Sequence, residues 1–174
     1  MLKVILLSCL FLASNASAES MEELKVRAAE GDSGAQSSLG LIYDNGEGVD
    51  RDLKVAIKWW QLAAEQGNAG AQYNLGVVNS NGEGLIQNYK EAIKWYSKSA
   101  EHGNVNAQYN LGNLYLRGQG AAQNDKLAFS WFIKAAEQGD APAQYNLGRM
   151  YILGKGDDKN FLEARFWIKQ ALEN

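Results

Sequence analysis

Few residues of this 174-residue sequence could do chemistry, and they do not assemble a recognisable catalytic set. The chain holds one histidine, His102, and one cysteine, Cys9. An ordinary zinc or iron site takes three or four histidine, cysteine or carboxylate ligands, so these two residues do not suggest one. The sequence predicts no metal and no cofactor. It favours His102 as an exposed residue at a helix end, where the ring interacts with the helix dipole.

A serine nucleophile and a phosphate-binding loop are the other chemical candidates. Ser99 precedes His102 by one helical turn, but it occupies a position that Ala63 and Ala135 fill in equivalent segments, which favours packing over catalysis. No serine stands three residues before a lysine, the spacing of penicillin-binding enzymes. Gly-x-Gly elements such as 82–84 lack the Gly-Lys-Ser/Thr ending of a phosphate loop. Since the carboxylates form no convincing pair, we expect a protein that is not an enzyme.

The elements around these residues form a repeat of 36 residues. The hexapeptide Ala-Gln-Tyr-Asn-Leu-Gly occupies residues 71–76, 107–112 and 143–148. A fixed period of this length is typical of solenoids, in which each unit buries its apolar face against the next. Columns that keep one residue type in all four units include Ala35/71/107/143, Leu39/75/111/147, Gly40/76/112/148, Gly46/82/118/154, Gly48/84/120/156, Ala56/92/128/164 and Trp59/95/131/167.

Each unit is predicted to hold two helices. In the second unit, Ala71, Leu75 and Val78 recur at helical spacing and give the first helix an apolar stripe. Small residues such as Gly76 let the two backbones approach, while Leu75 and Trp95 fill the space between neighbouring pairs. The expected buried stripe of the second helix consists of Ala92, Trp95, Tyr96 and Ser99. A lone helix over residues 22–30 is expected before the first full unit.

Side chains that start and stop helices stand at the predicted boundaries. Asparagine and aspartate are good N-cap residues, and glycine is the usual C-terminal stop. Glu91 and Glu163 follow their caps at the spacing of a capping box. The predicted N-caps are Asn68, Asn104 and Asp140 for first helices, and Asp52, Asn88, Asn124 and Asn160 for second helices.

The N-terminal 18 residues have the pattern of a secretory signal peptide. Lys3 gives the positive start, residues 4–13 the apolar run, and residues 16–18 a small-residue site with cleavage after Ala18. The run is too short for a membrane span. We expect a periplasmic or secreted protein without disulfides, since Cys9 leaves with this segment. The rival interpretation is a lipoprotein signal with Cys9 as the lipidated residue.

The charge balance argues against nucleic acid as a partner. The sequence carries 17 lysines and arginines against 20 acidic residues, a net charge of −3, and the basic residues are scattered. Nucleic-acid-binding domains concentrate basic residues on one face. We therefore expect a protein or peptide partner, and no membrane span in the mature chain.

The repeat resembles the Sel-1-like repeat, a relative of the tetratricopeptide repeat. The residues that carry the resemblance are A-x-A-Q-Y-N-L-G-x-x-Y-x-x-G-x-G, then an acidic or amide residue, A-x-x-W and A-A-E-x-G, across Ser33 to Asn174. The resemblance implies a right-handed all-α superhelix whose first helices line the concave face. We divide the chain into a signal peptide (1–18), a capping helix (19–32) and a repeat domain (33–174) with units 33–68, 69–104, 105–140 and 141–174.

The same resemblance implies what the protein does. Family members usually act as adaptors that assemble protein complexes, and secreted bacterial members are linked to host interaction or the cell envelope. One cysteine-rich branch binds or hydrolyses β-lactams, and its members carry a cysteine pair in each unit. This chain would have no cysteine after cleavage. The rival function, a β-lactam-binding protein or a β-lactamase-like or cell-wall hydrolase, rests on that branch alone.

Three columns of the first helices could face a groove and bind a partner. The asparagines of the first column could bridge a peptide backbone or form an amide ladder to the neighbouring helix. Arg117 and Arg149 depart from the internal pattern, so they could select a carboxylate or be solvated surface residues. The columns are Ser38/Asn74/Asn110/Asn146, Leu41/Val77/Asn113/Arg149 and Asn45/Asn81/Arg117/Leu153, and the adjacent Tyr73, Tyr109 and Tyr145 could face either core or groove.

Three further residues depart from the repeat pattern, and each has a structural interpretation. Asn79 replaces the tyrosine of the other units and is either a tolerated defect or an opening in the groove. Arg165 stands in an otherwise apolar column, as the solvent-facing end of a solenoid requires. Phe166 replaces a polar residue and could dock a partner or a second copy. The sequence as a whole predicts a secreted or periplasmic adaptor that binds a partner peptide or protein in the concave groove.

Overall fold

The computed structural model describes residues 20–174, and all regular structure in this range is helical. An unpaired first helix precedes four helical pairs, which confirms the all-α solenoid of 36-residue units. The predicted signal peptide, with the Cys9 of the rival lipoprotein interpretation, lies outside the described residues. The helices are α1 (Met21–Ala29), α2 (Ser33–Asn45), α3 (Leu53–Glu65), α4 (Ala69–Asn81), α5 (Tyr89–Glu101), α6 (Val105–Arg117), α7 (Asp125–Glu137), α8 (Ala141–Leu153) and α9 (Phe161–Glu173).

Helices begin at a side-chain cap, and first helices end at a glycine. In α4, Asn68 Oδ1 accepts a hydrogen bond from the Ala71 N–H at 2.9 Å, and Gly82 follows the helix with φ of 76°. This is the left-handed region that glycine adopts without steric cost. The other predicted caps accept equivalent bonds, so the predicted boundaries are confirmed.

The capping boxes predicted at Glu91 and Glu163 are wrong. A box needs the cap residue's own N–H to be available. The Asn88 N–H instead donates to the Asn79 carbonyl at 2.8 Å, across the turn between α4 and α5. Glu91 Oε2 accepts from Lys94 Nζ at 3.2 Å. The turn within each repeat has therefore already used the donor that the box requires.

Within each repeat, the two helices meet where an aromatic or aliphatic side chain lies on a glycine. In the second unit the Tyr96 ring of α5 covers Gly76 of α4, where a methyl group would overlap the ring. In the third, a Cβ on Gly112 would stand 2.8 Å from Phe132. The four contacts are Gly40 with Trp60, Gly76 with Tyr96, Gly112 with Phe132 and Gly148 with Ile168. A side chain at these glycines would displace the facing side chain or the helix that carries it.

The invariant tryptophans pack between neighbouring repeats. Trp95 is half-buried and packs on the core that α3 and α4 form together. Trp59, Trp131 and Trp167 hold the same place against the cores before them. This confirms that the tryptophans fill space between pairs. The more deeply buried side chain is the next residue along, as in Trp60, which is 2% exposed, a column whose residue type varies.

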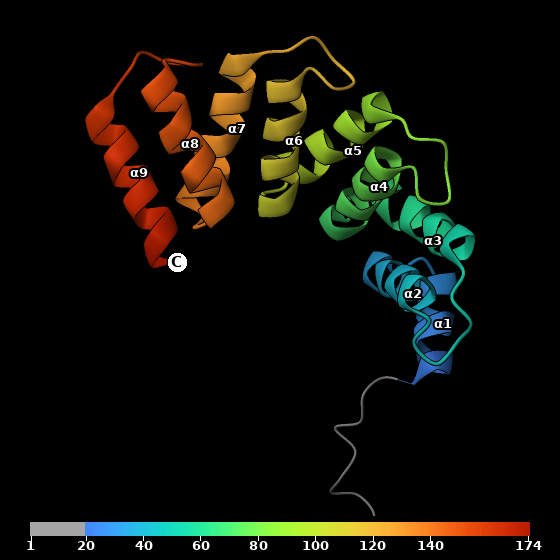
Figure 1. Cartoon of the computed structure of the whole chain (residues 1–174). Coiled ribbons are helices and arrows are strands. Elements are labelled where there is room, and N and C mark those ends of the chain that lie inside the picture. The colour runs from blue at the N-terminus through green and yellow to red at the C-terminus, as the bar shows by residue number, and fades with distance from the viewer. Residues whose placement is uncertain (1–19) are drawn as a thin grey trace, which may run out of the picture.

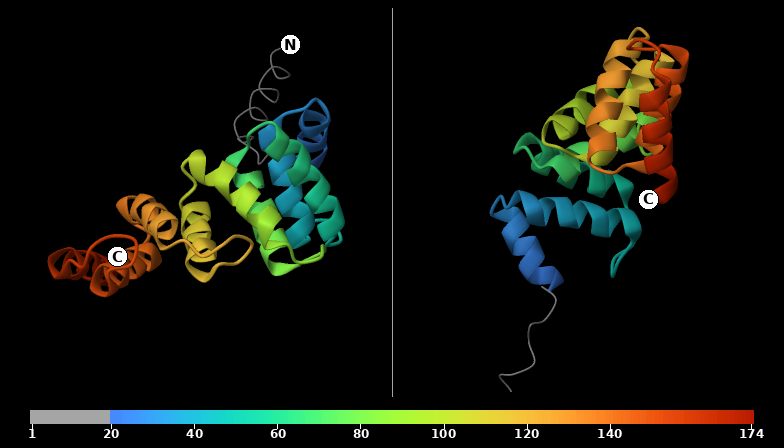
Figure 2. Two further views of the ribbon diagram at one scale, coloured as in Figure 1. Left: turned by 90° about the horizontal axis from the view of Figure 1, so that it is seen from above. Right: turned by 90° about the vertical axis from the view of Figure 1, so that its left-hand side faces the viewer.

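The helices follow one another around an arch (Figure 1), and orthogonal views show that their axes turn progressively along it (Figure 2). Each second helix packs on its own first helix, and α3, α5 and α7 also pack on the first helix of the next repeat. The first helices α2, α4 and α6 also touch in sequence, so they form a continuous inner row. None of the helices in residues 20–174 is long and apolar enough to cross a membrane.

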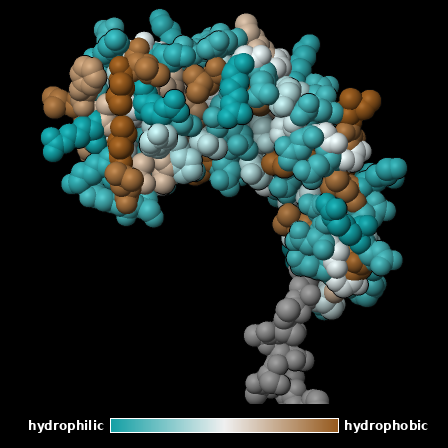
Figure 3. All heavy atoms as spheres, viewed as in Figure 1, coloured by the Kyte–Doolittle hydropathy of each residue, from teal (hydrophilic) through white to brown (hydrophobic). Residues whose placement is uncertain are grey.

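The last helix leaves apolar side chains uncovered. Phe161, Leu162 and Leu172 of α9 are 67%, 81% and 82% exposed, and apolar side chains gather at this end in Figure 3. Arg165 is exposed, as predicted for the end of the stack, and Phe166 packs edge-on against Trp167 with ring centroids 5.0 Å apart.

The contact between Gly76 and the Tyr96 ring predicts how a substitution changes stability. Gly76→Ala is expected to lower the free energy of unfolding by about 1–3 kcal/mol, because the added methyl group displaces the Tyr96 ring or the α5 backbone. Urea unfolding followed by circular dichroism measures this loss.

Gly70→Ala is the matched control in the same helix. Gly70 is exposed, and the atom nearest to an added Cβ is 3.4 Å away. Alanine is the better helix former, so this variant should stay within about 1 kcal/mol of the wild type or gain stability. Equal losses in the two variants would contradict the importance of the glycine–ring contact.

Candidate functional site

A pocket of about 500 Å³ opens between the first helices α4 and α6. Its lining is aromatic and polar, and Arg117 is the one charged residue among the lining residues. The opposing α4 and α6 supply most of the wall, and two residues of α5 complete it from behind. The lining residues are Tyr73, Val77, Ser80, Asn81, Tyr89, Tyr96, Tyr109, Asn110, Asn113, Leu114, Arg117 and Gln119.

Helical periodicity places these side chains on facing surfaces. On α4, Tyr73, Val77 and Ser80 recur at i, i+4 and i+7 and share one face. On α6, Asn113 and Arg117 follow Tyr109 by one and two turns in the same way. The caps and the glycine stops fix where each helix begins and ends, and so fix which residues face the gap.

Tyr96 forms the floor of the pocket. It is 2% exposed, lies on Gly76, and its ring centroid is 5.9 Å from that of Tyr73. Its hydroxyl and Ser80 Oγ are 3.3 Å apart and hydrogen-bonded. Burial raises the pKa of the Tyr96 phenol to about 12, and hydrogen bonds with Ser80 and Asn110 lower that pKa by less. The phenol is therefore neutral at physiological pH.

A second, smaller hollow of about 110 Å³ lies between α6 and α8. Arg149 in this hollow stands over the Tyr145 ring, with its guanidinium carbon 5.9 Å from the ring centroid. Lys155 Nζ is 3.8 Å from Asp125 Oδ2. The lining residues are Leu116, Asn146, Arg149, Met150, Leu153 and Lys155.

The predicted site residues divide between the two hollows. Five line the larger pocket, namely Tyr73, Tyr109, Asn110, Asn113 and Arg117. Asn146 and Arg149 line the smaller one. Asn74 and Tyr145 line neither of these two, although Tyr145 is 50% exposed beside Arg149. The asparagine and tyrosine columns therefore face the groove only in part.

Asn79 is not an opening in the groove. Its side chain is 8% exposed, and its amide donates to the Leu75 carbonyl one turn earlier at 2.8 Å. Burying an amide is tolerable when it is hydrogen-bonded. The substitution is therefore accommodated inside the repeat, behind the groove surface.

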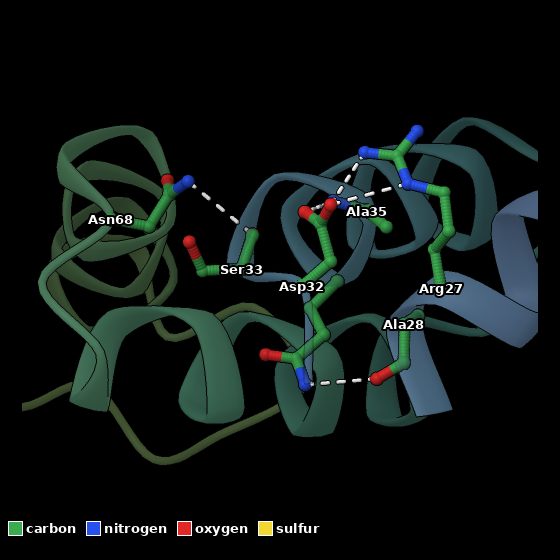
Figure 4. A network of polar contacts seen from close by, with 7 residues as sticks. Arg27, Ala28, Asp32, Ser33, Ala35 and Asn68 are labelled. Carbon is green, nitrogen blue, oxygen red and sulfur yellow. Dashed lines mark hydrogen bonds and ion pairs between the residues drawn. The ribbon is translucent and has the colours of Figure 1, made fainter. Parts of the chain in front are cut away.

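A ladder of amides does tie the repeats together, but glutamines make it. Gln72 Nε2 donates to the Ala64 carbonyl at the end of α3, at 3.1 Å. Gln36, Gln108 and Gln144 make the same bond to Ala28, Ala100 and Ala136. The bond that the Ala28 carbonyl accepts is drawn in Figure 4, together with the Asp32 cap and its partner Arg27.

The other end of each glutamine is held by the second helix of its own repeat. Gln66 donates to Gln36 at 2.8 Å, Gln138 to Gln108 at 2.8 Å, and Asn174 to Gln144 at 3.0 Å. Sequence reasoning passed over this glutamine. Two signals could have found it: the glutamine is the same in all four units, and an amide or imidazole recurs 30 residues later.

His102 is the imidazole member of that ladder. Its Nδ1 lies 3.1 Å from Gln72 Oε1. Since the Gln72 amide nitrogen is engaged with Ala64, the oxygen faces the ring and Nδ1 is the donor. His102 is exposed at the end of α5, as predicted, but it also joins two helices. Ser99 Oγ donates to the Ala69 carbonyl at 2.7 Å, so this serine has the packing role that its column suggested.

A family model and solved structures match the chain. The model described as Sel1 repeat matches residues 33–68, 69–104, 105–140 and 141–174. No curated protein matches significantly. A protective antigen of uropathogenic Escherichia coli with an SLR fold is similar, at 40% identity and TM-score 0.85, over 88% of this chain and 33% of that one.

Two further structures are similar. A Sel1 repeat protein from Oxalobacter formigenes has 36% identity and TM-score 0.80, over 87% of this chain and 44% of that one. The cysteine-rich protein B of Helicobacter pylori has 27% identity and TM-score 0.55, over 71% and 88%. This chain thus spans less than half the length of the first two relatives.

The buried phenol predicts how stability changes at alkaline pH. The unfolded chain loses the Tyr96 proton near pH 10, whereas the folded chain keeps it until about pH 12. The stabilisation is complete below pH 10 and is lost between those values, by about 2–3 kcal/mol. In Tyr96→Phe this part of the decline should disappear. Urea unfolding of both proteins across this pH range measures it, and identical declines would contradict the assignment.

Proposed function

The chain belongs to the Sel1 repeat family, and we propose that it is a binding module that holds an extended peptide or loop of a partner protein along its first helices. The observation that carries the proposal is the pocket between α4 and α6, with its tyrosines, asparagines and single arginine. Aromatic rings contact apolar side chains, and asparagine offers both a donor and an acceptor to a peptide backbone.

The dimensions of the stack support an extended ligand. Packed helices lie roughly 8–10 Å apart, so four first helices offer roughly 35–40 Å of groove. An extended chain advances about 3.3 Å per residue and would cross it with roughly ten residues. The larger pocket would then hold two or three of those residues.

Export is part of this proposal. Residues 1–18 act as a signal peptide that is cleaved after Ala18, and the module works in the periplasm or outside the cell. The similar chain that is described as a protective antigen supports this location.

Photo-crosslinking in native cells tests the proposal. A photoreactive amino acid in place of Asn113, in the pocket, should give a covalent adduct with one or a few proteins. The adduct is expected in the periplasmic or extracellular fraction. The matched control is the same amino acid at Ser130, which is exposed on α7 and lines neither hollow. No adduct at position 113, or the same adducts at both positions, would overturn the proposal.

The rival function is that of a β-lactam-binding protein or a β-lactamase-like or cell-wall hydrolase, as in the cysteine-rich branch that the repeats resemble, and a cysteine-rich protein is among the similar structures. We expect pure protein to turn over a chromogenic β-lactam no faster than buffer, measured by absorbance. Turnover that Tyr109→Ala or Asn113→Ala abolishes would replace the binding proposal with an enzymatic one.

A further inference from the structure

We propose that the groove selects acidic peptide segments, with one carboxylate bound at Arg117 and a second at Arg149. This inference rests on the proposed function and names the chemistry of its ligand. It follows from the sign of the charges in the groove, from the free donors of the two arginines and from their placement on successive first helices.

The groove has the opposite charge to the protein as a whole. The sequence carries a net charge of −3. The residues that line the two hollows nevertheless include Arg117, Arg149 and Lys155 and no aspartate or glutamate, and in the part of the chain that the structure describes only Lys155 of these three cations is paired, with Asp125 of α7. Charges separated by more than about 8 Å are screened at physiological salt, so a ligand in the groove responds mainly to the local cations.

Within residues 20–174, neither groove arginine has a carboxylate partner. Arg117 makes no hydrogen bond or ion pair there, and the neighbour of Arg149 is the Tyr145 ring. By contrast, Arg51, away from the two hollows, binds both the backbone and the carboxylate of Asp44, at 2.6 and 3.1 Å. The guanidinium groups of Arg117 and Arg149 keep their donors for a ligand. A planar guanidinium matches a carboxylate with two parallel hydrogen bonds.

The asparagines around the arginines suit a peptide. Asn113 donates its amide to the Tyr109 carbonyl at 3.2 Å, which leaves its side-chain oxygen as an acceptor for a ligand N–H. Asn110 and Gln119 line the same pocket. An inorganic anion has no N–H to donate to these acceptors, whereas a peptide backbone presents an N–H at nearly every residue.

The spacing of the two arginines predicts the spacing of the acids. Arg117 lies on α6 and Arg149 on α8, which are consecutive first helices roughly 8–10 Å apart, and Arg149 stands one helical turn, about 5.4 Å, earlier in its helix than Arg117 does in its own. The two backbone positions are therefore about 10–11 Å apart. In an extended chain this distance corresponds to about three residues. The expected ligand therefore carries carboxylates about three positions apart, from Asp or Glu side chains or with the chain terminus as one of the two.

Selection from a random decapeptide library, displayed with free C-termini, tests the inference. Wild-type protein should enrich peptides with two carboxylates about three positions apart, and the Arg117→Ala/Arg149→Ala variant should not. A selected peptide, measured by fluorescence polarisation, should bind each single variant roughly five- to tenfold more weakly. Replacing its acids by Asn or Gln should have the same effect, and added salt should weaken binding. A C-terminal amide then separates a terminal carboxylate from a side chain.

Arg165→Ala, an exposed arginine on α9, is the matched control and should bind like the wild type. Melting temperatures of all variants should agree, because the replaced side chains are exposed. Enrichment without acids, or equal enrichment by wild type and double variant, would overturn the inference. If the photoreactive amino acid at position 113 still cross-linked a partner protein in that case, the proposed binding function would remain supported. Only the proposed preference for acidic peptides would be wrong.

Discussion

The contact on which the structure depends is the one between a glycine of each first helix and a large side chain of its partner. It recurs as Gly40 with Trp60, Gly76 with Tyr96, Gly112 with Phe132 and Gly148 with Ile168. Helix interiors disfavour glycine by about 1 kcal/mol relative to alanine. This cost of glycine is offset because the facing side chain, such as the Tyr96 ring, packs directly on bare backbone. Its packing there sets the distance between the two helices. A solenoid is a sum of such units and their interfaces, so this distance fixes the shape of the whole row.

A second set of contacts, made by buried polar side chains, connects neighbouring repeats. Each buried glutamine, such as Gln72, bonds to the end of the preceding second helix and to the end of its own. A buried amide whose groups are satisfied favours one register of packing, since a shift of one turn would leave it unpaired. Because the glycines and glutamines hold the repeats together, the exposed side chains of Arg117 and Arg149 are not needed for stability. They are free to differ between repeats and to meet a ligand.

The sequence was sufficient to predict the repeats, the paired helices, the caps and the glycine stops, since these follow from periodicity and local chemistry. It was sufficient to place Arg117 and Arg149 as departures from the pattern, and both line a hollow. It placed Tyr96 in the buried stripe but did not identify the contact of its ring with Gly76, because the residue type in this column changes from unit to unit. It overlooked Gln72, whose two partners lie far away in the sequence. The failed capping boxes have the same cause, since the Asn88 N–H is taken by a residue in the preceding helix.

The most direct test of the account is a nuclear magnetic resonance spectrum of the asparagine side-chain amides, recorded with and without a selected acidic peptide. The side-chain amides of Asn110, Asn113 and Asn146 lie in the two hollows, whereas that of Asn124 caps α7 outside them. The account predicts that the first three shift together as peptide is added and that the Asn124 amide stays in place. Shifts confined to Asn124 and the second helices, with the groove amides unmoved, would contradict it.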